Sequence, residues 1–226
     1  MRKSDGRHKK TKHKAMQTLL TTDSKHVAKM ASTCSTTDEL ADNVIKLGLS
    51  VGEIFKGRNG QKMAIVSNGH VNLINSVHCP FPAGVYGGDG TERRVNLDAV
   101  LSEPDEFVIR RLDRRILEIA KERSIEWFGK TLSEEAIASK YSPMCRLRDG
   151  ESSRLRTKLN LDSIVVWDHN KTLAAVPECK FAGMDVKCVL RLTSVWFMSN
   201  NFGVTVQLTQ IQIPEEKDSS KLVCPF

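Results

Sequence analysis

The sequence lacks long hydrophobic runs. Its apolar stretches, such as Ile164–Trp167, fall far short of the roughly 20 residues that a transmembrane helix needs. No apolar segment follows the basic N-terminus, so a secretory signal is not expected. The six cysteines are dispersed, with none at the CxxC spacing of zinc ribbons and fingers. We therefore expect a reduced, intracellular protein without a zinc site.

Motifs of the common enzyme classes are also missing. The segment Gly87-Gly88-Asp89-Gly90 is not followed by Lys-Ser/Thr, so it is no P-loop, and there is no Gly-x-Ser-x-Gly elbow. His70, His78 and His169 have no partner at ligand spacing, and the predicted strands carry few of the acids that a two-metal nuclease needs. We predict a binding protein rather than an enzyme, with no cofactor and no metal.

The positive charge of the chain is concentrated at its N-terminus. The formal net charge is +7. Residues 1–30 contain nine Lys or Arg and two acids, whereas residues 31–226 contain 25 of each sign. The excess charge is therefore a property of the first segment and not of the remainder.

Residues 1–43 are rich in Lys, Ser, Thr and His and have little hydrophobic periodicity, so we predict a disordered basic arm. Its densest basic run fits a nucleic-acid arm, a nuclear import signal or a solvated leader. The candidate contacts in this run are Lys9, Lys10, Lys12 and Lys14.

Short apolar runs between turn signals predict strands from residue 44 to about 100. Asn68-Gly69 between two such runs predicts a tight hairpin. Residues 104–142 are predicted to be helical, with a start at Pro104-Asp105-Glu106 and a second short helix capped by Thr131. The helix arginines alternate with acids, and pairing such as Glu106 with Arg110 is favoured over a nucleic-acid contact.

Strands are predicted again after the helices, to about residue 213. Strands, then helices, then strands, without regular βαβ alternation, predict a mainly β fold: an antiparallel barrel or sandwich with a helical insertion. The domain is expected to span 44–213, with the insertion at about 104–142 and a C-terminal tail at 214–226.

Alternation sorts the side chains of the predicted strands into two faces. In Asp185–Met198, one face carries Trp196 and is predicted to be core. The other face carries Lys187, Arg191 and Phe197, which mixes cations with an exposed aromatic ring.

Three cations alternate along another predicted strand, where Arg154, Arg156 and Lys158 would lie about 7 Å apart on one face. That spacing is close to the phosphate repeat of an extended single strand, and cations beside aromatic rings are typical of single-strand binders. An ordinary solvated sheet face is the alternative. Trp127-Phe128 is predicted to pack the helix on the barrel, and Trp167 fits either core or contact.

The segment Val189–Gln210, VLRLTSVWFMSNNFGVTVQLTQ, resembles the closing hairpin of the single-stranded DNA-binding proteins of nucleocytoplasmic large DNA viruses. Further matching elements follow the same order, and together they cover roughly residues 60–213. They are Cys79-Pro80-Phe81 with Gly84-Val85, Trp127-Phe128-Gly129-Lys130, and Tyr141-Ser142-Pro143.

These viral proteins are similar to the single-stranded DNA-binding protein of short-tailed coliphages, which implies an OB-fold barrel with an inserted helix. The resemblance also implies coating of single-stranded DNA in replication, recombination and repair, without catalysis. Such proteins often end in an acidic tail closed by an aromatic residue that recruits replication partners. This chain ends in Pro225-Phe226, although Lys217 and Lys221 offset the nearby acids.

The sequence therefore predicts a viral single-stranded DNA-binding protein that acts without sequence specificity, in the host nucleus or at a cytoplasmic replication site. Its expected partners are single-stranded DNA, replication proteins bound through the tail, and further copies of the chain, but no membrane. The alternatives are an RNA-binding OB-fold protein and an assembly protein with a nucleic-acid-packaging tail. The predicted contacts are Arg154, Arg156, Lys158, Lys187, Arg191 and Phe197, then Trp167 and the basic arm.

Overall fold

The computed structural model describes residues 48–57, 59–146 and 152–215, all within one compact unit of the chain. The predicted arm 1–43 and nearly all of the predicted tail 214–226 lie outside these residues, so both boundaries stay predictions. Along the chain the elements are β1 (Ser50–Lys56), β2 (Lys62–Ser67), β3 (His70–Asn72), β4 (Val77–Cys79), β5 (Arg94–Val100), α3 (Glu103–Glu122), α4 (Ser124–Phe128), α5 (Glu134–Ala138), β6 (Tyr141–Ser142), β7 (Cys145–Arg146), β8 (Arg154–Asn160), β9 (Val165–Trp167), β10 (Leu173–Ala174), β11 (Met184–Phe197) and β12 (Phe202–Gln212).

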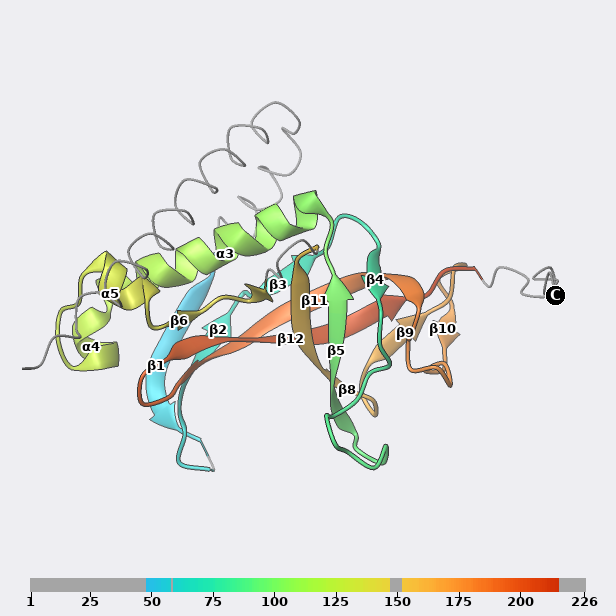
Figure 1. The fold of residues 1–226 in the computed structure, drawn as a ribbon, viewed down its shortest axis with the longest axis horizontal. Helices are drawn as coiled ribbons and strands as arrows, with labels where there is room; N and C mark the ends of the chain where they lie inside the picture. Colours follow the sequence, from blue (N-terminus) through green and yellow to red (C-terminus); the bar gives the residue numbers. More distant parts are fainter. Residues whose placement is uncertain (1–47, 58, 147–151, 216–226) are drawn as a thin grey trace, which may run out of the picture. The chain divides into compact units, whose positions relative to one another are not determined.

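One mixed sheet contains every described strand (Figure 1). Its longest pairing is the antiparallel hairpin of β11 and β12. Along its other edge, β12 runs parallel to β6, β8 and β9. The prediction of an antiparallel arrangement is therefore wrong in this part, because the β11–β12 hairpin returns the chain in the direction that β8 and β9 already have.

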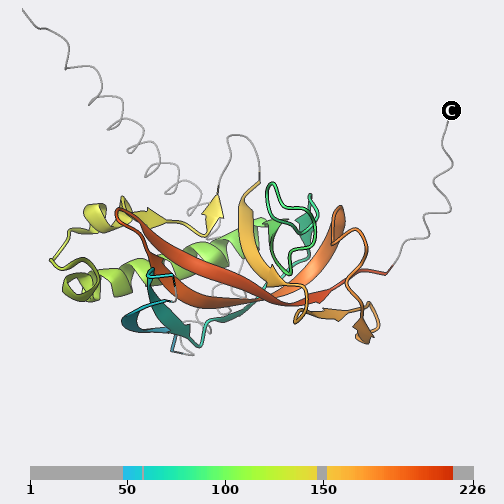
Figure 2. The ribbon, with the colours of Figure 1, turned by 90° about the horizontal axis from the view of Figure 1, so that it is seen from below.

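The strand pairings also form a ring in the order β11, β4, β5, β8, β12 and back to β11. Two of the strand pairings in this ring consist of a single residue pair each: His78 opposite Val100 between β4 and β5, and Gln207 opposite Lys158 between β12 and β8. Figure 2 shows the strong curvature of the long strands that contribute to this ring. The fold is thus mainly β with a curled sheet, but it is not a regular barrel.

Asn68-Gly69 does not form the predicted hairpin. Instead, β2 and β3 lie one after the other along the same edge of β11, opposite Phe197–Ser194 and Arg191–Val189 respectively. Asn68 has a positive φ of 56°, and a Cβ on Gly69 would come within 2.6 Å of the Leu192 carbonyl oxygen. The Asn-Gly pair therefore carries the chain around a bend between β2 and β3, which pair with β11 one after the other.

Helix α3 lies along the sheet, with α4 and α5 at one end of the domain and β9 and β10 at the other (Figure 1). Its apolar residues at helical spacing, including Ile109, Leu112 and Ile116, are buried. The helix begins after Ser102, whose hydroxyl oxygen accepts the Asp105 N–H at 3.4 Å. The predicted helix and its start near Pro104 are confirmed, and the helix buries one apolar face.

The second predicted helix begins two residues later than expected. Ser133, and not Thr131, is its cap: the Ser133 hydroxyl accepts the Ala136 N–H at 3.3 Å, and the helix ends at Ala138. Tyr141 already belongs to β6, where it pairs with Phe202 of β12. The Thr131–Glu134 spacing matched a capping box, but Ser133 beside it offers the same chemistry, so spacing alone did not select the cap.

Candidate nucleic-acid interface

The alternation predicted for β8 is confirmed. Leu155, Thr157 and Leu159 are buried, whereas the cations at alternate positions point to the opposite face. On this face Arg156 and Lys158 are exposed and Arg154 is half-buried. The strand takes this orientation because its apolar and hydroxyl side chains at alternate positions pack into the core, which leaves the cations between them on the outer face.

The three cations of β8 differ in their partners. Arg156 donates two hydrogen bonds to the Asp98 carboxylate, at 2.7 and 2.9 Å, and this contact lowers the pKa of Asp98. The guanidinium of Arg154 lies 5.7 Å from the centre of the Phe81 ring. Lys158 forms no ion pair or side-chain hydrogen bond with any residue that the structure describes. Its charge is therefore free for an external anion, whereas that of Arg156 is largely neutralised.

On β11, Lys187 and Arg191 are exposed, as predicted, but Phe197 is not. A register shift between Leu192 and Ser194 marks a bulge, after which the alternation inverts. Phe197 consequently points into the core with 8% of its surface exposed. The prediction of Phe197 as a contact residue is wrong, because period-two sorting fails beyond a bulge.

Phe197 instead belongs to an aromatic cluster between the helices and the sheet. Its ring centre lies 5.1 Å from that of Trp127 in α4 and 6.2 Å from that of Phe202. Trp127 is buried, which confirms its predicted role in packing the helical segment on the sheet. The Phe197–Trp127 pair is edge-to-face and the Phe197–Phe202 pair is stacked, and ring pairs of both kinds stabilise the cluster beyond the burial of their area.

Trp196 takes the place on the exposed face that Phe197 was expected to hold. It is half-buried and pairs with Met63 of β2 and Gly203 of β12. A Cβ on Gly203 would come within 2.6 Å of the Trp196 ring, so only glycine lets the indole lie directly on β12. One side of the ring is thus supported by the sheet, in the arrangement of a platform on which a base can stack.

The register of the sheet joins the two groups of cations. Lys158 lies opposite Gln207, Gln207 opposite Arg191, and Arg191 opposite His70. Paired residues of neighbouring strands point to the same face, and strands lie about 4.8 Å apart. We call this surface the basic face; it comprises His70, Lys158, Lys187, Arg191, Trp196 and Gln207.

The basic face is nearly free of acids for a reason visible in the sequence. No Asp or Glu occurs from Val186 to Pro214, which covers all of β12 and all of β11 except its first two residues, and the one acid of β11, Asp185, lies 2.9 Å from His78. Neither Lys187 nor Arg191 has an ion-pair or hydrogen-bonding partner for its side chain among the described residues. The field above these strands is therefore positive although residues 31–226 are neutral in sum.

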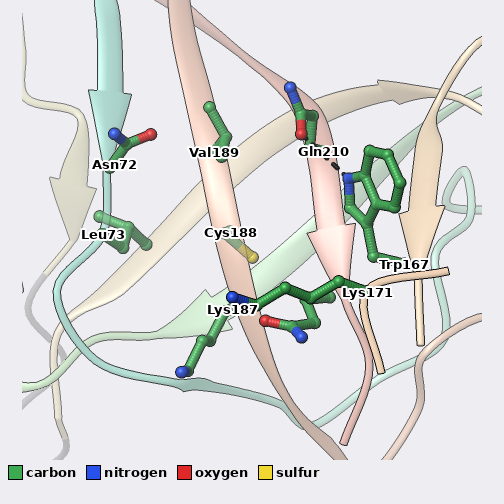
Figure 3. Close-up of a pocket in the computed structure, with 9 residues that line it drawn as sticks. Asn72, Leu73, Trp167, Lys171, Lys187, Cys188, Val189 and Gln210 are labelled. Carbon is green, nitrogen blue, oxygen red and sulfur yellow. Dashed lines mark hydrogen bonds between the residues drawn. The ribbon is translucent and has the colours of Figure 1, made fainter. Parts of the chain in front are cut away.

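A pocket of about 430 Å³ opens at the end of β11 and β12 that lies near β9 (Figure 3). Its lining includes Trp167, Lys171, Lys187 and two glutamines of β12. The indole N–H of Trp167 donates to Gln210 at 3.0 Å, and the ring is half-buried. Trp167 and Lys187, predicted separately, are thus brought together.

Sequence reasoning missed the aromatic residues of the β4–β5 loop and the amides of β12. Phe81 is 52% exposed beside Arg154, and the Tyr86 side chain stands fully in solvent. Gln210 and Gln212 alternate at the end of β12, a spacing that could have indicated a polar pocket. The basic-run lysines 9–14 and the terminal Pro225-Phe226 lie outside the described residues, so these contacts stay predictions.

The described residues contain no group of three or more His, Cys, Asp or Glu that could hold a metal ion. Within the same residues, no helix combines the length and apolar character needed to cross a membrane. The basic face and the pocket together offer free cations, amide groups and the indole rings of Trp196 and Trp167. This combination is suited to a flexible polyanion with planar groups.

A protein-family model described as "Family of unknown function (DUF5871)" matches residues 87–222. No curated protein sequence matches the chain.

Among solved structures, the chain is similar to the single-stranded DNA-binding protein from bacteriophage Enc34 in complex with ssDNA, with 12% identity over 76% of this chain and 97% of that chain and a TM-score of 0.46. It is also similar to gp2.5, a single-stranded DNA-binding protein encoded by bacteriophage T7, with 14% identity over 68% of this chain and 96% of that chain and a TM-score of 0.44.

Proposed function

Because the chain belongs to a family of unknown function (DUF5871), we propose its function from the geometry of the basic face: the protein binds single-stranded DNA without sequence specificity. Cations of β8 and β11 contact phosphates, and Trp196 and Trp167 stack on bases. Each stacked base contributes on the order of 1–3 kcal/mol. The proposal includes no catalytic step.

One observation carries this proposal: Lys158, Lys187 and Arg191 share an exposed sheet face on which none of them meets an acid among the described residues. Like charges held together without counterions repel one another, so their common orientation favours an external polyanion. Trp196 on the same face favours single strands over duplex, because bases inside a duplex cannot stack on a protein ring.

An OB-fold barrel belongs to the same proposal. Supporting it are the ring of pairings through β11, β4, β5, β8 and β12 and the insertion of α3, α4 and α5 between β5 and β6. OB-folds bind single strands across an exposed sheet face, which is where the free cations lie.

The biological setting rests on the resemblance to viral proteins described above. We place the activity in viral DNA replication, recombination and repair, in the host nucleus or at a cytoplasmic replication site. The basic run 9–14 is proposed to add phosphate contacts, and Pro225-Phe226 to recruit replication proteins. Self-association of the chain is part of the same proposal.

Fluorescence anisotropy of the full chain with labelled oligo-dT tests the function, with duplex DNA and oligo-rU of the same length as competitors. We expect oligo-dT to bind at least tenfold more tightly than duplex. With three free cations on phosphates, log K should fall with log[salt] with a slope of about −2 or steeper.

Three outcomes would contradict the proposal. Duplex binding equal to or tighter than single-strand binding would show that bases do not stack on the indole rings. Tighter binding of oligo-rU would favour the RNA-binding alternative. Unchanged binding by a K158E/K187E/R191E variant would assign all affinity to the arm, as the assembly alternative requires.

A further inference from the structure

The pocket at the end of β12 contains two glutamine side chains whose amides are each fixed in one orientation. Trp167 fixes the first, because an indole N–H can only donate. Its partner at 3.0 Å is therefore the amide oxygen of Gln210. Figure 3 shows this contact, with the Gln210 nitrogen pointing away from the indole. Gln210 is left with its NH2 group free to donate.

Gln212 is fixed in the opposite sense by backbone carbonyls. Its amide nitrogen donates to the carbonyl oxygens of Asp168 and His169, at 3.1 and 3.4 Å. A carbonyl can only accept, so the amide cannot be flipped without losing both contacts. The amide oxygen of Gln212 is therefore the atom left to accept a hydrogen bond.

The two glutamines share one side of the pocket. They are separated by one residue on β12, opposite Val189 and Lys187 of β11, so their Cα atoms lie about 7 Å apart on the same face. Leu73 and Val189 add apolar surface to the lining. The volume of about 430 Å³ lies in the range of sites that hold small planar molecules.

Two ammonium groups lie at the same pocket. Lys187 projects from β11, and Lys171 reaches over from the turn between β9 and β10 (Figure 3). Neither lysine has an ion-pair partner among the described residues. A fixed donor, a fixed acceptor, an indole ring and two free cations are the groups that a nucleotide would engage.

We propose that this pocket holds one nucleobase of the bound strand, with its Watson–Crick edge hydrogen-bonded by the Gln210 NH2 and the Gln212 oxygen. Lys171 and Lys187 contact the phosphates that flank this base. Every base has a donor or acceptor pattern on that edge, so the pocket tolerates any sequence. A paired base has its edge occupied, so the pocket selects single strands by hydrogen bonding as well as by stacking. This inference rests on the proposed function and deepens it.

A chemical change in the ligand tests the proposal on the unaltered full chain. Oligo-dT in which every thymine carries a methyl group on N3 has lost the N3–H donor, but it keeps its phosphates and ring faces. Binding is compared with that of ordinary oligo-dT by anisotropy. We expect the methylated strand to bind about tenfold more weakly, which is the size of one to two lost hydrogen bonds.

Variants locate the effect in the pocket. Q212L should bind ordinary oligo-dT about tenfold more weakly and should no longer distinguish it from the methylated strand. Q61L is the matched control, because Gln61 lies exposed in the turn between β1 and β2, and it should keep the full discrimination. Q210L provides a second pocket variant if Q212L does not fold.

The outcomes separate this inference from the proposed function. Tight binding of oligo-dT with no penalty for methylation would overturn the pocket inference and leave single-strand binding intact. Discrimination that persists in both Q212L and Q210L would also overturn it. Failure of the full chain to prefer oligo-dT over duplex would overturn the proposed function, and the pocket inference with it.

Discussion

The arginines of α3 and the cations of the basic face have opposite surroundings. On the helical side, Arg110 donates to Glu106 at 2.7 Å, and Arg115 lies 3.0 Å from Glu118. On the sheet, Lys187 and Arg191 meet no acid among the described residues. Positive charge supports the fold in the first region and is left available in the second.

The difference follows from the two backbone periodicities. On a helix, residues three and four apart are neighbours, so the acids interleaved in α3 reach its arginines locally. In a sheet, the neighbours of a side chain come from other strands, and pairing depends on what those strands carry. Asp98 of β5 reaches Arg156 in this way, but the residues opposite Arg191 are Gln207 and His70, and neither is an acid. A charged residue is therefore informative only together with its neighbours in the fold.

The largest effect is expected where the helical layer and the sheet share a core. Phe197→Ala should lower the free energy of unfolding by about 3–5 kcal/mol, because it leaves a cavity beside Trp127 and Phe202. Urea unfolding followed by tryptophan fluorescence measures this change. A loss below about 1 kcal/mol would mean that Phe197 is not packed in the cluster.

Trp196→Ala is the matched control, one residue away on the other face of β11. It should cost only about 1 kcal/mol of stability. Its affinity for oligo-dT should fall by about 1–3 kcal/mol, or roughly five- to 150-fold in Kd. If the two variants exchanged these effects, the bulge would not invert the faces as described.

The next prediction concerns Asp113, a buried acid in α3. The Asp113 carboxylate accepts hydrogen bonds from the Tyr141 hydroxyl at 2.5 Å and from the Met144 N–H at 3.2 Å. Burial nevertheless raises the pKa of Asp113 from 3.8 to about 6. The folded protein then binds this proton more tightly than the unfolded chain, so the carboxyl group stabilises the fold below pH 4 and loses this contribution as the pH rises through 6.

Asp113→Asn removes this titration while keeping an oxygen for Tyr141 and Met144. Between pH 4 and pH 7, the unfolding free energy of the original protein should fall relative to that of D113N by up to about 3 kcal/mol. Urea unfolding of both proteins across this range measures the difference. A difference that stays constant with pH would show that Asp113 does not titrate with a raised pKa.

The sequence was a good guide where a pattern is local. The buried face of α3, the pairing of Glu106 with Arg110, and the two faces of β8 follow from residues a few positions apart. The sequence was a poor guide where the pairing register of distant strands determines which face a side chain occupies. The bulge after Leu192 exchanged Trp196 and Phe197 between faces, because the extra residue depends on how β12 pairs with β11.

The pairing register of the strands also brings residues into the candidate site that the sequence alone could not connect. Lys158 and Arg191 are 33 positions apart, and they are linked only because Gln207 pairs with both. Gln210 and Gln212 carried no signal as single residues, since their orientation comes from Trp167 and from the carbonyls of the next turn. Each of these relations joins segments that no local pattern connects.

The smallest effect compares two arginines of equal charge in the two regions. Arg191 lies on the basic face, and Arg114 is exposed on α3. Neither arginine forms an ion pair among the described residues, so replacing it breaks no such contact in the fold. R191Q should weaken oligo-dT binding a few-fold and reduce the salt slope by about 0.7, as expected for one lost phosphate contact, whereas R114Q should change neither. Because both variants alter the net charge by the same amount, equal losses would mean that the overall charge attracts DNA and that the basic face holds no specific contact.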